Sequence, residues 1–539
     1  MNFHANNLRR FFPATATLAG ADGWERFCSG LSKPVDAEAL TAKFIAFAQQ
    51  NDIAPHAVDI FSIERERSLV EASEEAIPEA GDARAVNPTL RLLKVTHRGL
   101  AGLLLDDAVS AAQPEPGEEY ILVWRMPASG EIRVAAASRE DLLALKIVAE
   151  GLDIRELARQ GETTVGALDG MLFHAGTRGI LMQPRSKIER DPLIFRKGEI
   201  HDDGYLLARG FTIQWHITQA CDLHCKHCYD RSDRSPMPYD KALGILADLY
   251  DFCDERHVCG NVTFTGGNPF LYPRFFDLYR AAADYGFGLA ILGNPLPRDS
   301  MRKMLEIRKP LHFQISLEGL RERNDAVRGE GHFERSLAFL GLLREHAVPS
   351  MVMLTLTNDN IDDVLPLADL LRDSTETFHF NRLAMVGEGA NLRLPDRKKY
   401  QDFLHAYVKA TEENPIMGWK DNFLNIALRE QGKPLFGGCA GFGCAAAFNF
   451  VAILPDGEVH ACRKFPSRIG NIYEQPLGAI YDSAVAGRYR AGCSACAPCP
   501  IRAVCGGCLA VSYGCGLDVF NEKDPWCFLE NDITAEHRR

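Results

Sequence analysis

The stretch that decides the fold is Cys221-Asp-Leu-His-Cys225-Lys-His-Cys228, within WHITQACDLHCKHCYDRSD at residues 215–233. Three cysteines fall within eight residues, directly after a strand-like run, FTIQWHIT. Structural zinc sites and simple iron–sulfur sites use four protein ligands. Three thiols in one loop therefore indicate a metal centre with one position left open for chemistry. The alternative is a zinc knuckle completed by a histidine of the same loop.

Bulk composition describes a large folded protein. The chain has 539 residues, 46% hydrophobic and 24% charged, which predicts about two to four domains. The net charge of −12 disfavours broad binding to nucleic acid or anionic lipid. The sequence contains no run of about eighteen apolar residues, so we expect no transmembrane helix. The pair Arg9-Arg10 precedes only a short apolar stretch broken by Pro13, so we expect no export signal and a cytoplasmic protein.

Cysteine usage points to metal. The chain has 16 cysteines, and ten crowd the last hundred or so residues, at positions 439, 444, 462, 493, 496, 499, 505, 508, 515 and 527. In a secreted mini-protein such a cluster would indicate disulfides, whereas in a large chain in a reducing compartment it indicates metal ligation. Cys28, Cys253 and Cys259 lie elsewhere, and we interpret them as small buried hydrophobic residues.

Two segments are predicted in the first part of the chain. Residues 1–85 show helical spacing, with Asp36 as the N-cap of a helix in DAEALTAKFIAFAQQNDI. Residues 90–185 contain three strand-like runs, TLRLLKVTH, EYILVWRM and EIRVAAA, of which the last two read as a hairpin. Three short helical patterns and the strand-like GILMQP follow. This order predicts a small winged-helix-like domain.

Strands alternate with helices from about residue 205. Six strand-like runs, each followed by a helical pattern, predict an α/β fold with a parallel sheet long enough for a partial barrel at 205–392. Ligands in such folds bind at the carboxyl ends of the strands, where the three cysteines lie. Residues 393–435 read as connecting helices. Residues 436–539 are rich in Gly, Pro and Cys, so we expect no large core there and a dependence on metal ligation.

The C-x3-C-x2-C motif after a strand resembles the radical S-adenosylmethionine (SAM) enzymes. The resemblance implies that Cys221, Cys225 and Cys228 bind three irons of a [4Fe–4S] cluster, and that SAM binds the fourth iron through its amino and carboxylate groups. Reductive cleavage of SAM would then give a 5′-deoxyadenosyl radical that abstracts hydrogen, with flavodoxin or ferredoxin as electron donor. The zinc alternative, with His224 or His227 as fourth ligand, is disfavoured because further family motifs follow in order.

Those motifs supply candidate cofactor contacts. FTGGNP matches the family's Gly-Gly-Glu-Pro loop, where Gly266 and Gly267 would let the backbone approach the methionyl amine. It departs from the pattern at Asn268, whose amide can accept a hydrogen bond from an ammonium group but brings no charge. QISLEG and RGEG match the next motifs, which implies cofactor contacts by Ser316 and by Arg328, the latter pairing with the carboxylate.

The C-terminal region resembles the SPASM extension of this family, which carries two auxiliary [4Fe–4S] clusters. The resemblance implies one ligand set of Cys439, Cys444, Cys462 and Cys508 and a second set of Cys496, Cys499, Cys505 and Cys527. The spacing before Cys508 is x2 where the family has x3, which puts that ligand in doubt. Cys493 and Cys515 are left over, and each either replaces a neighbouring ligand or is an inert thiol.

The front domain bears on the substrate. Its three strands and three helices resemble the PqqD-like winged helix of ribosomal peptide (RiPP) maturation, which binds a leader peptide as an extra strand. DNA binding is disfavoured because the expected recognition helix, TTVGALDGMLFHAG, contains neither Arg nor Lys. A purely structural role for the domain is the other alternative.

The expected function is therefore that of a radical SAM peptide maturase. It would abstract hydrogen from a residue of a precursor peptide to make a thioether or a related oxidative modification. The motifs GGNP and KDPWC resemble those of the selenobiotic, or thio(seleno)oxazole, type. The alternatives are a non-peptide enzyme acting on a tetrapyrrole or small molecule, a binding module whose clusters transfer electrons, and a sulfatase-type protein maturase. Sulfatase maturases carry an Asp base where this chain has Arg463, which disfavours the last alternative.

Overall fold

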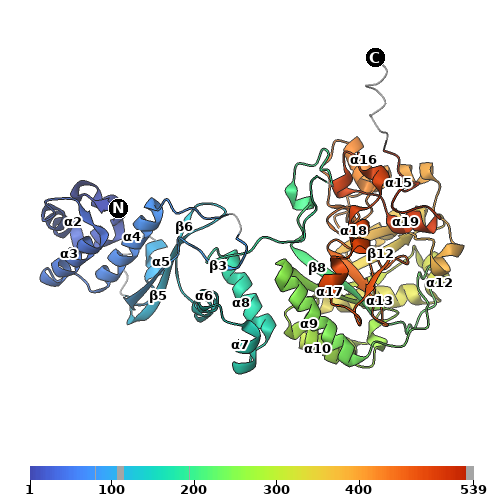
Figure 1. The fold of residues 1–539 in the computed structure, drawn as a ribbon, viewed down its shortest axis with the longest axis horizontal. Helices are drawn as coiled ribbons and strands as arrows, with labels where there is room; N and C mark the ends of the chain where they lie inside the picture. The colour runs from blue at the N-terminus through green and yellow to red at the C-terminus, as the bar shows by residue number, and fades with distance from the viewer. Residues whose placement is uncertain (79–80, 106–113, 194, 530–539) are drawn as a thin grey trace, which may run out of the picture. The chain divides into compact units, whose positions relative to one another are not determined.

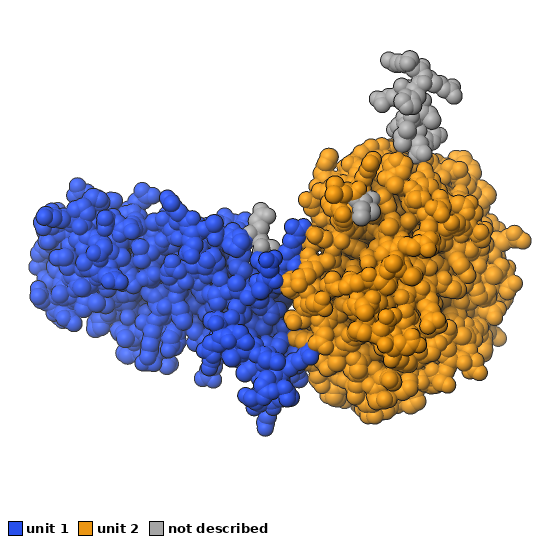
Figure 2. Space-filling model, viewed as in Figure 1, with its two compact units in different colours: residues 1–185 blue, residues 186–539 orange. Residues whose placement is uncertain are grey.

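The computed structural model describes residues 1–78, 81–105, 114–193 and 195–529. The chain folds into two compact units, unit 1 at residues 1–185 and unit 2 at residues 186–539 (Figure 2). The last ten residues of the predicted C-terminal domain lie outside the described residues. Among the described helices, none combines the length and the apolar character that crossing a membrane requires.

Unit 1 begins with a small helical layer built around aromatic side chains. Phe61 stacks between Phe12 and Phe44, at ring-centroid distances of 4.4 and 4.3 Å. The predicted cap is confirmed, because the Asp36 carboxylate accepts a 2.8 Å hydrogen bond from the Ala39 N–H. The elements of this layer are β1 (Asn2–Phe3), α1 (Leu8–Phe11), α2 (Pro13–Ser29), β2 (Val35–Asp36), α3 (Ala37–Gln50) and α4 (His56–Ala72), with β1 paired to β2.

The rest of unit 1 contains a three-stranded antiparallel sheet in the order β4-β5-β6. Its strands are β4 (Arg91–His97), β5 (Pro116–Arg125) and β6 (Ile132–Ala136), with α5 (Leu100–Leu105) between the first two. Three helices follow, α6 (Arg139–Glu150), α7 (Ile154–Gln160) and α8 (Val165–Thr177). A second small sheet pairs β3 (Ala85–Val86) with β7 (Leu181–Met182). The predicted order of three strands and three helices is thus present.

Both faces of this sheet are covered, which joins the two predicted front segments into one unit. On one face Leu122 and Trp124 pack with residues of α6 and α8. On the other face Ile121 and Val123 share a core with α4, including Ile60. Residues 90–185 thus have a buried core on one face of the sheet, and they share a second core with α4 on the other face.

Unit 2 is built on a nine-stranded sheet in the order β13-β12-β11-β10-β9-β8-β14-β15-β16. Six successive strands run parallel, as predicted: β8 (Gly210–Thr218), β9 (Cys259–Gly266), β10 (Gly288–Leu292), β11 (His312–Ser316), β12 (Ser350–Leu356) and β13 (Thr377–Arg382). Alternating apolar residues place side chains such as Ile213 and Trp215 fully in the interior. A partial β/α barrel results.

Helices between the strands lie around this sheet (Figure 1). They are α9 (Tyr239–Arg256), α10 (Phe275–Asp284), α11 (Arg298–Ile307), α12 (Arg321–Arg328), α13 (His332–Glu345) and α14 (Val364–Leu371). The predicted connecting helices follow as α15 (Arg397–Ala410) and a short α16 (Leu424–Glu430).

The expectation that the Cys-rich segment buries no large core is wrong. Its first strand, β14 (Phe450–Ile453), pairs in parallel with β8 and so extends the barrel sheet, and Val451 and Ile453 are fully buried. The segment therefore shares the barrel's core instead of building a separate one. The remaining elements are β15 (Glu458–His460), β16 (Arg468–Asn471), α17 (Leu477–Tyr481), α18 (Ala484–Ala491) and α19 (Leu509–Gly514). Strands of three or four residues are too short to show periodicity in a sequence.

Candidate functional site

A cavity of about 360 Å³ opens at the carboxyl ends of the parallel strands. Of the eight residues predicted for the SAM site, seven line it: Cys221, Cys225, Cys228, Gly266, Gly267, Ser316 and Arg328. The C-terminal segment contributes Arg463 and Lys464 to the wall. The structure thus brings together residues that are more than 200 positions apart in the sequence.

The three thiols of the cysteine loop have neighbours suited to an iron–sulfur cluster. Burial raises the pKa of the Cys225 and Cys228 thiols, and the neighbouring sulfurs raise it further. Arg328 Nη1 lies 3.6 Å from Cys225 Sγ, and Asn294 Nδ2 lies 3.8 Å from Cys221 Sγ. Such N–H donors beside sulfur are among the groups that tune cluster potentials.

The zinc-knuckle alternative finds no support. His227 Nε2 is bonded to Glu318 Oε1 at 2.8 Å, and His224 Nδ1 is bonded to Arg231 Nη1. Across the described residues, no three His, Cys, Asp or Glu side chains converge closely enough to ligate a single metal ion. Three thiols with N–H donors beside two of their sulfurs are a donor set that fits an iron–sulfur cluster.

The two glycines of the FTGGNP loop are required by close backbone packing. A Cβ on Gly266 would lie 2.1 Å from the Thr218 carbonyl oxygen, and a Cβ on Gly267 would lie 2.2 Å from the Ala220 oxygen. Gly266 also has a φ of +133°. Any larger residue here would displace the chain that leads into the cysteine loop.

Asn268, the eighth predicted residue, lies outside the cavity wall. It is buried, and its Nδ2 donates to Asp222 Oδ1 at 3.0 Å. Its Oδ1 accepts from the Phe270 N–H at 3.2 Å and caps a short 3-10 turn, η3 (Pro269–Leu271). Asp222 also accepts a 2.6 Å bond from Asn294. The amide of Asn268 therefore anchors the cysteine loop and has its oxygen engaged by backbone.

A buried triad beside Cys225 was not predicted. The Glu318 carboxylate accepts from Arg328 Nε and Nη2 at 2.9 and 2.6 Å, from His227, and from the Thr355 N–H at 2.8 Å. Burial alone would raise the pKa of Glu318, but the charges and hydrogen bonds of His227 and Arg328 lower it to about 2. Arg328 thus has a protein carboxylate as partner. The only sequence signal was a Glu two residues after Ser316, in QISLEG.

All four cysteines predicted for the second auxiliary cluster line one small cavity of about 20 Å³, namely Cys496, Cys499, Cys505 and Cys527. Burial, followed by the charges of Cys493, Cys499 and Cys527, raises the pKa of Cys496 to about 12. Cys493 is therefore a close neighbour of this set, although it does not line the cavity.

The cysteines predicted for the first auxiliary cluster also lie near one another. Burial raises the pKa of Cys444 to about 12, with Cys508 and Cys462 contributing. The pKa of Cys462 is raised to about 11 by burial and by the charges of Cys508 and Cys439. The pKa of Cys515 is raised by burial and by the charge of Asp524, and no thiol contributes to this shift.

A buried ion pair links the barrel to this second region. Arg382, the last residue of β13, pairs with Asp421 and Asp524 at 2.8 Å each. Asp524 also accepts a 3.0 Å bond from the Cys508 N–H. These residues join the cavity wall to the cysteine-bearing backbone, and nothing in their local sequence indicated the contact.

Comparison with known proteins agrees with this geometry. The Radical SAM superfamily matches residues 215–371, and the iron-sulfur cluster-binding domain SPASM matches residues 444–508. The AdoMet-dependent heme synthase of Methanosarcina barkeri is 26% identical over 341 residues, which is 58% of this chain and 95% of that protein. The subtilosin biosynthesis protein AlbA of Bacillus subtilis is 26% identical over 59% of this chain and 70% of its own length. The mycofactocin maturase MftC of Mycolicibacterium smegmatis is 26% identical over 58% and 82%.

Among solved structures, Streptococcus suis SuiB bound to its precursor peptide SuiA has a TM-score of 0.50 and 16% identity. It covers 76% of this chain and 96% of that one. This match covers more of the chain than unit 2 contains, so the shared fold extends into unit 1. The chain is therefore an enzyme that contains a radical SAM domain and a C-terminal SPASM domain, and its cofactors are SAM and [4Fe–4S] clusters.

Proposed function

We propose that this enzyme is a peptide maturase, which binds the leader of a ribosomally made precursor through unit 1 and modifies a core residue in the cavity of unit 2. The observation that carries the proposal is that no described strand pairs with the outer edge of β6. Two relatives, one named for bacteriocin biosynthesis and one named as a mycofactocin maturase, support the proposal.

The hydrogen-bonding pattern shows which backbone groups of β6 are available. Ala137 N–H donates to the Tyr120 oxygen and Met126 N–H donates to the Glu131 oxygen, so residues 131, 133, 135 and 137 face β5. The N–H and C=O groups of Ile132, Val134 and Ala136 consequently point away from β5. No described strand pairs with that side of β6. An extended leader can add there as a fourth strand.

Side-chain recognition would come from α8. Phe173 on this helix is 55% exposed, which is unusual for a large aromatic residue, while Leu168 on the same helix is buried in the core. An exposed aromatic side chain suits contact with an apolar leader residue.

In unit 2, Cys221, Cys225 and Cys228 would hold the SAM-binding cluster. When bound, the cluster and SAM supply a radical that abstracts hydrogen from the substrate. A flavodoxin or ferredoxin would deliver the electron. Arg463 lines the cavity where a sulfatase maturase has its Asp base, and this favours a reaction that needs no carboxylate base at that position.

A tetrapyrrole substrate is the second candidate, because heme synthases match with the same 26% identity as the peptide maturases. Binding of a precursor peptide to the full-length protein separates the two. The probes are synthetic peptides for the small open reading frames beside the gene, titrated calorimetrically, with Fe-coproporphyrin III titrated in parallel.

The decisive variant is Val134→Pro in the full chain. It removes an outward N–H without breaking the β5–β6 ladder, so peptide affinity should fall by about five- to tenfold, the loss of one backbone hydrogen bond. Val134→Ala is the matched control, which trims the side chain but keeps the donor and should bind within about twofold of wild type. SAM cleavage without substrate should persist in both. Equal peptide binding by the Pro variant and wild type, or tight porphyrin binding with no peptide binding, would overturn the proposal.

A further inference from the structure

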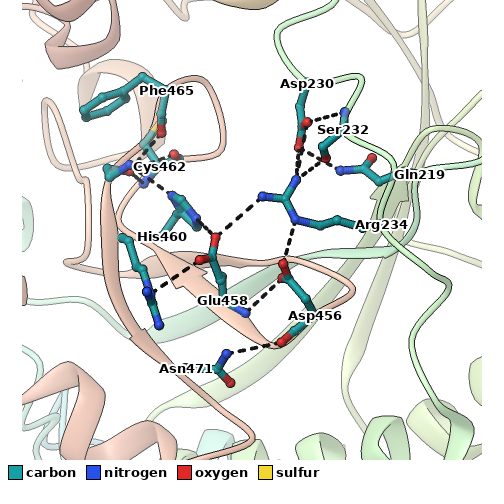
Figure 3. A network of polar contacts seen from close by, with 12 residues as sticks. Gln219, Asp230, Ser232, Arg234, Asp456, Glu458, His460, Cys462, Phe465 and Asn471 are labelled. Atoms are coloured by element: carbon teal, nitrogen blue, oxygen red, sulfur yellow. Dashed lines mark hydrogen bonds and ion pairs between the residues drawn. The ribbon is translucent and has the colours of Figure 1, made fainter.

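A polar network joins the loop after the SAM-cluster cysteines to the SPASM hairpin (Figure 3). Its centre is Arg234, whose Nε donates to Asp456 Oδ2 at 2.7 Å and whose Nη1 donates to Asp230 Oδ2 at 3.1 Å. Arg234 also bonds Ser232 Oγ, and its Nη2 lies 3.6 Å from Glu458 Oε2. One guanidinium therefore holds carboxylates from two segments 222 residues apart.

The network ends on a predicted cluster ligand at each side. On the barrel side, Cys228 Sγ lies 3.2 Å from the Asp230 carbonyl oxygen, and Gln219 Nε2 donates to Asp230 Oδ2 at 2.7 Å. These contacts attach the network to the cysteine loop and to the end of β8.

On the SPASM side, the Glu458 carboxylate lies 3.2 Å from His460 Nε2. His460 Nδ1 accepts from the Ser467 N–H at 3.0 Å, and Ser467 Oγ accepts from the Cys462 N–H at 3.1 Å. An unbroken series of contacts thus runs from Cys228 to Cys462, a predicted ligand of the first auxiliary cluster.

The charges around Arg234 favour this arrangement. Burial alone would lower the pKa of Arg234, but the hydrogen bond to Asp456 and the charges of Asp230, Asp456 and Glu458 raise it. Arg468 lies 3.5 Å from the other oxygen of Glu458 and offsets part of the excess negative charge. Without Arg234, carboxylates from the loop and the hairpin would face each other with no cation between them, and the loop would lose its attachment.

We propose that Arg234 is a positioning residue that couples the SAM-binding loop to the auxiliary-cluster hairpin, so that the cluster at Cys462 stabilises the loop that binds SAM. The coupling concerns the established radical SAM chemistry and is independent of the substrate. Spatial continuity alone does not demonstrate coupling, so the test is a double-mutant cycle.

The experiment measures the SAM dissociation constant by equilibrium dialysis on the anaerobically reconstituted full-length protein. Wild type, Arg234→Met, Cys462→Ala and the double variant form the cycle. We expect each single change to weaken SAM binding by about tenfold, within the usual range of site-to-site coupling. In the Arg234→Met background, Cys462→Ala should weaken it by no more than about a further twofold. Arg234→Lys keeps the charge and should recover part of the affinity.

Arg256→Met is the matched control. Arg256 is 17% exposed, close to the 23% of Arg234, and it also joins a barrel helix to the SPASM segment, through a 2.5 Å pair with Asp482. Neither Arg256 nor Asp482 belongs to the series of contacts described around Arg234, so SAM affinity should be unchanged within about twofold even if the melting temperature falls.

A second route avoids removing a cluster ligand, in case Cys462→Ala does not fold. His460→Leu breaks the series of contacts between Glu458 and Ser467 and leaves all cysteines in place, so it should weaken SAM binding in the wild-type background but not in Arg234→Met. Addition of SAM changes the electron paramagnetic resonance spectrum of the reduced cluster, and this change should become smaller in each variant that binds SAM more weakly. The proposal is overturned if the effects in either cycle are additive, or if Arg234→Met binds SAM as wild type does.

Discussion

The cysteine loop of the barrel, Cys221 to Cys228, differs from the set of four cysteines near the C-terminus, Cys496, Cys499, Cys505 and Cys527, which we call the cage. The loop supplies three thiols to a cavity of about 360 Å³, whereas the cage supplies four thiols to a space of about 20 Å³. Cys221 in the loop is exposed, and Cys505 in the cage is buried. The cavity beside the loop therefore has room for a cofactor, and the one beside the four C-terminal cysteines does not.

This difference explains how similar ligands serve different roles. Metal sites that only stabilise or transfer electrons are closed by protein ligands, while catalytic sites keep a position open. The loop also has charged and polar neighbours, Arg328 and Asn294, directed at its sulfurs. The predictions below test whether the two sites differ in the way that their geometry indicates.

The largest effect should come from replacing Cys221, Cys225 and Cys228 together by Ala. SAM cleavage should fall to background, and iron should fall from about twelve to about eight per chain, since one of three four-iron clusters is lost. The measurement is iron content and 5′-deoxyadenosine yield after anaerobic reconstitution. The matched triple, Cys496, Cys499 and Cys505 to Ala, should lose as much iron yet retain SAM binding. Cleavage that survives in the first variant would contradict the assignment.

Glu318→Gln should have the next largest effect, on stability. The change leaves Arg328 buried without its carboxylate, at a cost of roughly 3–5 kcal/mol in the unfolding free energy. Glu318→Asp, which keeps the charge, should cost less. The measurement is urea unfolding of the cluster-free chain, followed by fluorescence, with Trp215 in the barrel core.

The stabilising effect of Glu318 should also depend on pH. The pKa of Glu318 is lowered from its ordinary 4.5 to about 2, so its stabilisation is complete above about pH 4.5 and is lost as the pH falls towards 2. The stability difference between wild type and Glu318→Gln should therefore shrink across that window. A difference that stays constant there would show that Glu318 is not held ionised by Arg328 and His227.

The smallest effect should come from Asn268→Leu. Because its amide bonds to Asp222 and the Phe270 N–H and not to the cavity, SAM affinity should weaken by only about threefold. Asn294→Leu should weaken it more, since Asn294 lines the cavity and bonds the same Asp222. A loss of about two decades at Asn268 would mean that this amide contacts the cofactor directly.

The sequence predicted elements whose signal is local and long. FTIQWHIT became β8, and the cap at Asp36 and the strands of the barrel followed from apolar alternation and known cap chemistry. Seven of the eight residues predicted for the SAM site share one cavity because parallel strands end at the same edge.

What the sequence missed depends on contacts between distant segments. β14 joins the barrel sheet although its four residues show no period, and Arg234 reaches Asp456 across 222 residues. Asn268 was expected in the cavity because its motif matches a cofactor loop, yet its side chain turns to Asp222. Side-chain direction in an irregular loop is set by tertiary hydrogen bonds, which a motif does not encode.

The central claim is that only one cluster can bind SAM, and that it does so through a single iron. Mössbauer spectroscopy of the ⁵⁷Fe-reconstituted protein with and without SAM tests it most directly. The account predicts about twelve irons per chain, of which one changes its environment when SAM is added and none does so in the Cys221, Cys225 and Cys228 triple variant. A spectrum that SAM leaves unchanged, or an iron content near four, would contradict it.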